Sequence, residues 1–244
     1  MKRALLALAL AGALPCAHGQ ELPASVELLG RVGGRTALIS LYAAKRPDGG
    51  WRISGEYVML PSLQRRFVAG ERSMQLGVTF LREGSTQIMY ARAPTATLQG
   101  TWTAGLLKGT RYGPGGQERE RFEFSDRFAS LEGYGAEVRC EVAEGPYGAR
   151  LAYSVAGGKL KSLEWRSKSA AGDWACALSA LDQRPMRGGL RFAAGTRCAV
   201  TLRDLGDFVR VTAEDCAEFC APGGALEALL VDRRGGCQLF RPKG

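Results

Sequence analysis

The feature that most constrains the fold of this chain is an alternation of apolar and polar side chains with a period of two, from residue 24 to residue 124. This period, with polar partners on the opposite face, is typical of half-buried antiparallel strands. Strands alternating with long helices, the pattern of α/β enzymes, do not occur, so the sequence predicts an all-β protein. The apolar sets predicted to share a strand face are Ala37, Ile39 and Leu41; Trp51, Ile53, Gly55, Tyr57 and Met59; Met74, Leu76, Val78 and Phe80; Leu98, Gly100 and Trp102; and Phe122 and Phe124.

Glycines recur inside these predicted strands. Gly30, Gly55, Gly70, Gly100 and Gly133 each follow an apolar residue within one or two positions. A glycine inside a strand marks a bulge, a bend or a close approach of backbones, and repeated bends let a sheet curl on itself. We therefore expect the first half to be an antiparallel meander or a small barrel.

Cysteines divide the chain into two halves. Apart from Cys16, all of them follow residue 139, and the sequence predicts a cysteine-free β-domain over 20–127 and a cysteine-rich β-domain over 128–244. Residues 1–19 have the layout of a signal peptide, so Cys16 is expected to be removed on export. The remaining even number of cysteines in an exported chain predicts three disulfides, with fifteen pairings open. Cys216 and Cys220, four apart, are expected on one short turn that carries two bridges. The six cysteines are Cys140, Cys176, Cys198, Cys216, Cys220 and Cys237.

The first nineteen residues have the layout of a signal peptide. Lys2 and Arg3 precede eleven residues without a polar side chain, and small residues stand before Gln20. The apolar run is too short to span a bilayer, so we predict cleavage between Gly19 and Gln20 and a periplasmic or secreted protein. Pro15 before Cys16 argues against a lipoprotein, and no later stretch is apolar enough to cross a membrane.

The charge is basic but scattered. The net charge is +9, and 26 of the basic residues are arginine while asparagine is absent, which is typical of a GC-rich genome. Scattered charge indicates a solvated surface, so no nucleic-acid partner is predicted. Attraction to an anionic envelope polymer stays open.

The inventory of reactive side chains argues against most catalysis. His18 is the only histidine and lies in the predicted signal peptide, so histidine-based triads and zinc sites are excluded from the mature chain. Bridged cysteines supply no thiolate, and no Gly-x-Ser-x-Gly motif, P-loop or dinucleotide fingerprint occurs. The sequence therefore predicts no catalytic residue, metal or cofactor.

Two groups of carboxylates leave a hydrolase as an alternative, because a glycosidase needs only two acids at a suitable separation. The first group alternates with arginines, which is typical of a solvated edge strand. The second lies beside the predicted cysteine turn. The groups are Glu118, Glu120 and Glu123, and Glu214, Asp215 and Glu218.

Trp165 is a candidate binding residue, because Arg166 and Lys168 lie close to it in the sequence. Together they could contact an anionic glycan or a protein. The alternative is a tryptophan that packs in the core.

The segment "GTRCAVTLRDLGDFVRVTAEDCAEFC" and the stretches "RISGEYVM" and "TATLQGTWTA" resemble uncharacterised proteobacterial exported β-rich proteins. Some of these neighbour lysozyme-inhibitor-like domains. Many relatives continue Cys-x3-Cys with glycine, whereas Ala221 follows here. The resemblance brings no catalytic residues.

These observations favour a non-enzymatic periplasmic binding or inhibitor protein whose partner is an envelope protein or an anionic envelope polymer. An inhibitor of a basic lysozyme needs a locally acidic loop, and Glu214 to Glu218 is the obvious one. The alternatives are a carboxylate-based hydrolase of envelope glycans and a structural envelope component.

Overall fold

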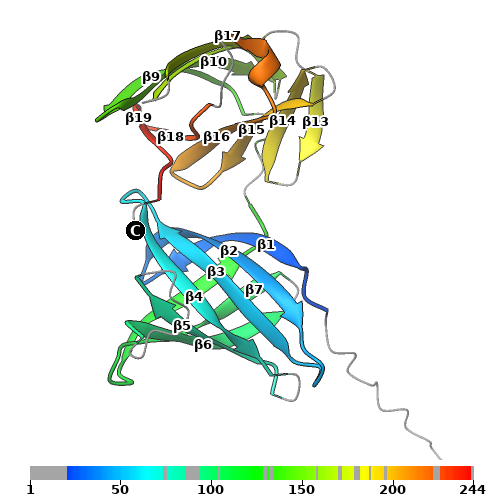
Figure 1. The fold of residues 1–244 in the computed structure, drawn as a ribbon, viewed down its shortest axis with the longest axis vertical. Helices are drawn as coiled ribbons and strands as arrows, with labels where there is room; N and C mark the ends of the chain where they lie inside the picture. The colour runs from blue at the N-terminus through cyan, green and yellow to red at the C-terminus, as the bar shows by residue number, and fades with distance from the viewer. Residues whose placement is uncertain are drawn as a thin grey trace, which may run out of the picture.

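The computed structural model describes residues 21–73, 76–85, 94–103, 105–128, 131, 134–157, 159–169, 172–178, 182–186, 188–194, 197–221 and 226–242. The predicted signal peptide, Cys16, Met74 and Gly133 lie outside them. The described chain is all-β, as predicted, and forms a barrel followed by two further sheets (Figure 1).

Eight antiparallel strands form the barrel, each paired with the next, and β8 pairs with β1 to close it. The barrel alternative of the sequence prediction is therefore the one realised. The strands are β1 (Ser25–Val32), β2 (Arg35–Lys45), β3 (Trp51–Met59), β4 (Gln64–Arg72), β5 (Val78–Gly84), β6 (Ala96–Thr103), β7 (Leu106–Tyr112) and β8 (Glu118–Ser125).

Glycines let neighbouring strands of the barrel approach one another closely. A Cβ at Gly30, Gly55, Gly70 or Gly100 would lie about 2 Å from a carbonyl oxygen of the neighbouring strand. The same holds for a Cβ at Gly109. No other residue fits such an approach. The glycine pattern thus correctly indicated a curled sheet in these strands.

The barrel interior is filled by side chains, among them Trp102, Phe122 and Phe124. The predicted inward faces of β2, β3, β6 and β8 are confirmed. The prediction for β5 is wrong, because Thr79, Leu81 and Glu83 point inward and Phe80 is 40% exposed. A shift of one residue moves every side chain of a strand to the opposite face.

The prediction that Glu118 to Glu123 lie on a solvated edge strand is wrong about the edge. Strand β8 pairs with β7 on one side and with β1 on the other, so it has no free edge. Its alternating charges reflect the two faces of a barrel wall: Arg119 and Arg121 are exposed, whereas Glu120 is partly buried.

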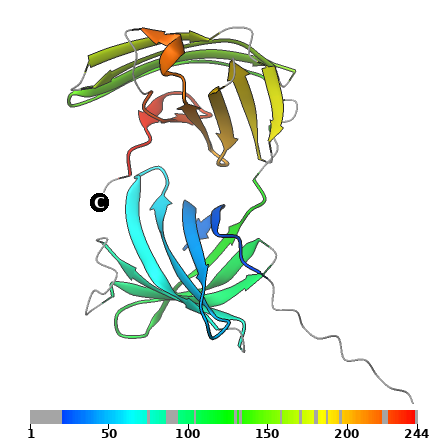
Figure 2. The same cartoon turned by 45° about the vertical axis from the view of Figure 1, so that its right-hand side comes forward.

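The cysteine-bearing half consists of two antiparallel sheets that share one hydrophobic core. Figure 2 shows the sheets stacked above the barrel. The first sheet contains β9 (Ala136–Glu144), β10 (Tyr147–Ala156), β11 (Lys159–Ser169), β12 (Gly172–Leu178) and β17 (Cys220–Ala221); the second contains β13 (Asp182–Met186), β14 (Gly189–Ala194), β15 (Cys198–Asp204), β16 (Phe208–Glu214), β18 (Leu229–Asp232) and β19 (Cys237–Leu239); a 3-10 turn, η1 (Ala217–Phe219), precedes β17.

Three disulfides staple this β-sandwich, as predicted. Cys140 on β9 pairs with Cys237 on β19 and thereby joins the edges of the two sheets. Cys176 pairs with Cys220, and Cys198 pairs with Cys216. Cys216 and Cys220 thus carry two bridges from one short turn, which the sequence also predicted.

The barrel contacts the sandwich through an apolar cluster and an ion pair. Glu27 on β1 accepts hydrogen bonds from Arg210 at 2.7 and 2.8 Å and also pairs with Arg203. Burial alone raises the pKa of Glu27, but the two arginines outweigh it and the pKa lies below its usual value. The apolar cluster joins Leu38, Val58, Leu60 and Leu63 of the barrel to Leu205, Phe208 and Leu230 of the sandwich.

Candidate functional site

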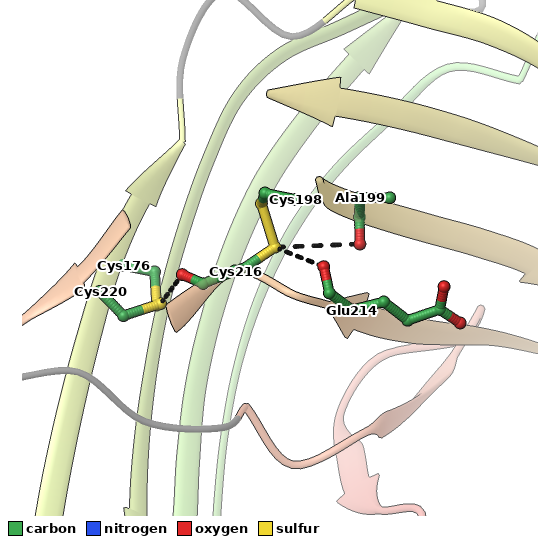
Figure 3. The surroundings of a disulfide bond; sticks show 6 residues. All are labelled: Cys176, Cys198, Ala199, Glu214, Cys216 and Cys220. Atoms are coloured by element: carbon green, nitrogen blue, oxygen red, sulfur yellow. Dashed lines mark hydrogen bonds between the residues drawn. A yellow bond between two sulfur atoms is a disulfide. The ribbon is translucent and has the colours of Figure 1, made fainter. Parts of the chain in front are cut away.

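The most distinctive surface element is the loop over residues 214–220, which we call the clamped loop. Its two cysteines are buried and bridge to different strands, Cys216 to β15 and Cys220 to β12 (Figure 3). The Cys216 sulfur lies 3.2 Å from the carbonyl oxygen of Glu214, and the Cys220 sulfur lies 3.1 Å from that of Cys216. Covalent bonds therefore fix the loop at Cys216 and Cys220, and Glu214 and Asp215 directly precede the first of these.

Backbone geometry fixes the loop further. Asp215 adopts a φ of 53°, in the left-handed region that aspartate tolerates better than most residues. The N–H of Phe219 donates to the carbonyl of Cys216 at 3.0 Å and closes the turn η1. Such a loop loses little conformational entropy on binding.

The side chains of the clamped loop face solvent. Glu214, Asp215 and Glu218 are exposed, and Phe219 is 38% exposed. Within the described part of the chain, no cation lies at ion-pair distance from any of the three carboxylates. The loop therefore presents three uncompensated negative charges beside one aromatic ring.

The structure separates Trp165 from its predicted partners. Trp165 is fully buried in the sandwich core, whereas Arg166 and Lys168 are exposed on the opposite face of β11. The three residues do not form a common contact surface. Trp165 instead lies opposite Cys176 in the register of β11 and β12, and Cys176 bridges to Cys220, so it belongs to the support beneath the clamped loop.

A second polar site lies inside the barrel, where the Glu83 carboxylate is completely buried. Arg111 donates to its two oxygens at 2.8 and 2.9 Å, and the Tyr57 hydroxyl donates at 2.6 Å. Arg66 lies at 3.6 Å. Burial alone raises the pKa of Glu83, but the hydrogen bonds from Arg111 and Tyr57 outweigh it, and the pKa lies below its usual value.

This network also brings two carboxylates together, which bears on the hydrolase alternative. Arg111 bridges Glu83 and Glu120, the latter at 3.2 Å, and Arg35 contacts the other oxygen of Glu120. A glycosidase needs one carboxyl group with a raised pKa to donate a proton. The pKa of Glu83 moves the other way, and Glu118 and Glu123 are exposed, so this arrangement suits a structural ion network.

Sequence reasoning missed both the Glu83 network and the exposure of Phe219. Glu83 stands in a strand whose apolar residues suggested the opposite face, so no pattern marked it as buried. Phe219 could have been found, because it lies between the two cysteines of a turn that was predicted to carry two bridges.

Among the described residues, no group of three or more His, Cys, Asp or Glu side chains is placed to hold a metal ion. No helix within this same part of the chain is long and apolar enough to cross a membrane. Comparisons with protein-family models, with curated proteins and with solved structures find no match to this chain.

Proposed function

We propose that this protein is a non-enzymatic, exported inhibitor that inserts the clamped loop into a positively charged cleft of an envelope protein. The observation that carries this proposal is the conjunction of three unpaired, exposed carboxylates with an exposed phenylalanine on a loop closed by two disulfides. The basic cleft of a muramidase is the first partner class to test, in line with the resemblance to proteins that neighbour lysozyme-inhibitor-like domains.

The charge distribution supports attraction of a basic partner by the clamped loop, not by the protein as a whole. The chain as a whole is basic, so a basic partner is repelled at long range. Screening reduces that repulsion beyond about 8 Å at physiological salt. At contact the three carboxylates therefore dominate, and the preorganised loop keeps the entropic cost of binding low.

The test compares two variants with the same change in net charge. Glu214→Gln/Asp215→Asn/Glu218→Gln removes the charges of the clamped loop. Glu118→Gln/Glu137→Gln/Glu164→Gln removes three exposed carboxylates elsewhere and serves as the control. Inhibition constants against a panel of muramidases with high isoelectric points are measured for both variants.

We expect the loop variant to weaken inhibition at least about tenfold and the control to leave it within about twofold. Phe219→Ala should also weaken it, because the ring would fill an apolar part of the cleft. Equal inhibition by the loop variant and the unmodified protein contradicts the proposal.

A further inference from the structure

The outer face of the barrel carries a polar surface that the clamped loop does not explain. The outward-pointing side chains on β5, β6 and β7 include no aspartate or glutamate among the described residues, and the neighbouring strand β8 carries the exposed Glu118 and Glu123 on either side of Arg121. They comprise mainly hydroxyl, amide and basic groups. They are Val78, Phe80, Arg82, Thr97, Gln99, Thr101, Thr103, Leu106, Lys108, Thr110 and Tyr112.

The strand register arranges these groups in rows that cross the strands. One row contains Phe80, Gln99, Thr110 and Arg121, the last of which lies on β8. We define the β5–β8 face by Phe80, Arg82, Thr97, Gln99, Tyr112 and Arg121. Arg82, Thr97 and Tyr112 form the second row, which continues on β8 to the exposed carboxylate of Glu118. With neighbouring strands about 4.8 Å apart, each row spans about 14 Å.

The cations of this face are not neutralised. No carboxylate in the described chain lies at ion-pair distance from Arg82 or Arg121, and both side chains are exposed. Glu71, which neighbours Phe80 on β4, is compensated by Arg46 at 2.7 Å. The face therefore presents guanidinium groups that are free to pair with the anionic groups of a ligand.

Phe80 adds an exposed aromatic ring to the polar rows. The electron-rich face of an aromatic ring attracts the polarised C–H bonds of a sugar. Gln99 and Thr97 can exchange hydrogen bonds with sugar hydroxyls, and arginine pairs with carboxylates through two parallel hydrogen bonds. This combination matches a sugar polymer that carries carboxylate groups.

The shape of the face selects an extended ligand. The outside of a closed barrel is convex, so it cannot enclose a small molecule, whereas a polymer can lie across it. Double-stranded DNA carries one charge per about 1.7 Å and favours a denser basic patch than two unpaired arginines. We propose that the β5–β8 face binds an acidic polysaccharide.

The test uses polygalacturonate as the probe and measures its dissociation constant by titration calorimetry at low and high salt. Arg82→Gln/Arg121→Gln should weaken binding about tenfold or more, and Phe80→Ala about fivefold. Arg139→Gln/Arg166→Gln, exposed on the sandwich and likewise without an ion-pair partner in the described chain, is the matched control and should leave the affinity within about twofold.

Three outcomes overturn the proposal: an unchanged affinity of the Arg82→Gln/Arg121→Gln variant, an equal loss in the sandwich control, or tighter binding of a DNA duplex than of polygalacturonate. Because the substituted side chains are exposed, these variants should fold normally. Circular dichroism checks that they keep the fold of the unmodified protein. The clamped-loop variant should bind polygalacturonate normally, so failure here is distinguishable from failure of the inhibitor proposal.

Discussion

The barrel and the β-sandwich are both antiparallel, but they end their sheets in different ways. In the barrel every strand has two neighbours, because β8 returns to β1. The sandwich leaves β9, β13, β17 and β19 with one strand neighbour each. Two of its three disulfides lie at these edges, Cys140–Cys237 between β9 and β19 and Cys176–Cys220 between β12 and β17.

Two of the three covalent bonds therefore lie at edge strands of the open sheets, whereas Cys198–Cys216 ties the central strand β15 to the clamped loop. A closed barrel satisfies every strand by geometry and needs no bridge. An open pair of sheets depends on its edges, and tying them together restricts the unfolded chain. The following predictions test whether the two regions are stabilised by different means.

Removal of the outermost disulfide should have the largest effect. Cys140 and Cys237 are 97 residues apart, for which loop-closure entropy gives about 4.7 kcal/mol. We expect Cys140→Ala/Cys237→Ala to lower the free energy of unfolding of the sandwich by about that amount and to spare the barrel. Hydrogen exchange followed by mass spectrometry reports the two regions separately. Equal loss of protection in both regions would show one cooperative unit instead.

Gly70→Ala should instead destabilise the barrel and spare the sandwich. Its Cβ would lie 1.9 Å from the carbonyl oxygen of Phe80, so the strands must separate. We expect a loss of about 3 kcal/mol, confined to the barrel. Gly135→Ala is the control, because its added Cβ would lie 3.7 Å from the nearest heavy atom, the carbonyl oxygen of Val155, which is an ordinary contact distance. Denaturant unfolding measures both variants, and an unaltered midpoint for Gly70→Ala would disprove the role of close approach.

Acid should destabilise the barrel through Glu83. Because its pKa is lower in the folded state, its stabilisation is complete above its ordinary value of 4.5 and is lost as the pH falls below that value. We expect Glu83→Gln to cost about 2 kcal/mol at pH 7 and to flatten the acid limb of the stability curve. Thermal unfolding between pH 7 and pH 2.5 checks this, and an acid limb of unchanged steepness would count against it.

Glu27→Gln should have the smallest effect, because it acts only where the two regions meet. Arg203 and Arg210 lose their shared carboxylate, and we expect a loss of about 1 kcal/mol. Hydrogen exchange should rise at the contact cluster around Leu63 and Leu205 while the centres of both regions stay protected. A rise throughout the barrel would mean that the contact stabilises the barrel itself.

Most of the barrel's inward-facing residues could be predicted from the sequence, because strand alternation and glycine positions are local features. Period-two alternation placed the inward residues of β2, β3, β6 and β8, and the glycines marked the close approaches. The inward face of strand β5 was predicted wrongly, because Leu76, Val78 and Phe80 are as apolar as the inward-facing Leu81. Hydrophobicity alone cannot choose between two apolar faces, and it disfavours burying Glu83, whose partners come from distant strands.

The sandwich was harder to predict. That the six cysteines form disulfides was predicted from their even number and from the predicted export of the chain. Which cysteine pairs with which depends on the strands that meet, and that is a property of the whole fold. Trp165 shows the limit of reading neighbours in the sequence as neighbours in space. It alternates with Arg166, so the strand itself places the two side chains on opposite faces.

The six bridged cysteines pair in a nested order, the first with the last, the second with the fifth and the third with the fourth. This order has a consequence for biogenesis. A chain that is oxidised as it leaves the membrane, amino end first, meets Cys140 and Cys176 together long before Cys237, and joining them would trap a wrong bridge. For the exported chain that the signal sequence predicts, correct maturation would call for oxidation that begins at the innermost pair, Cys198 and Cys216, and proceeds outward, or for an isomerase that exchanges early errors.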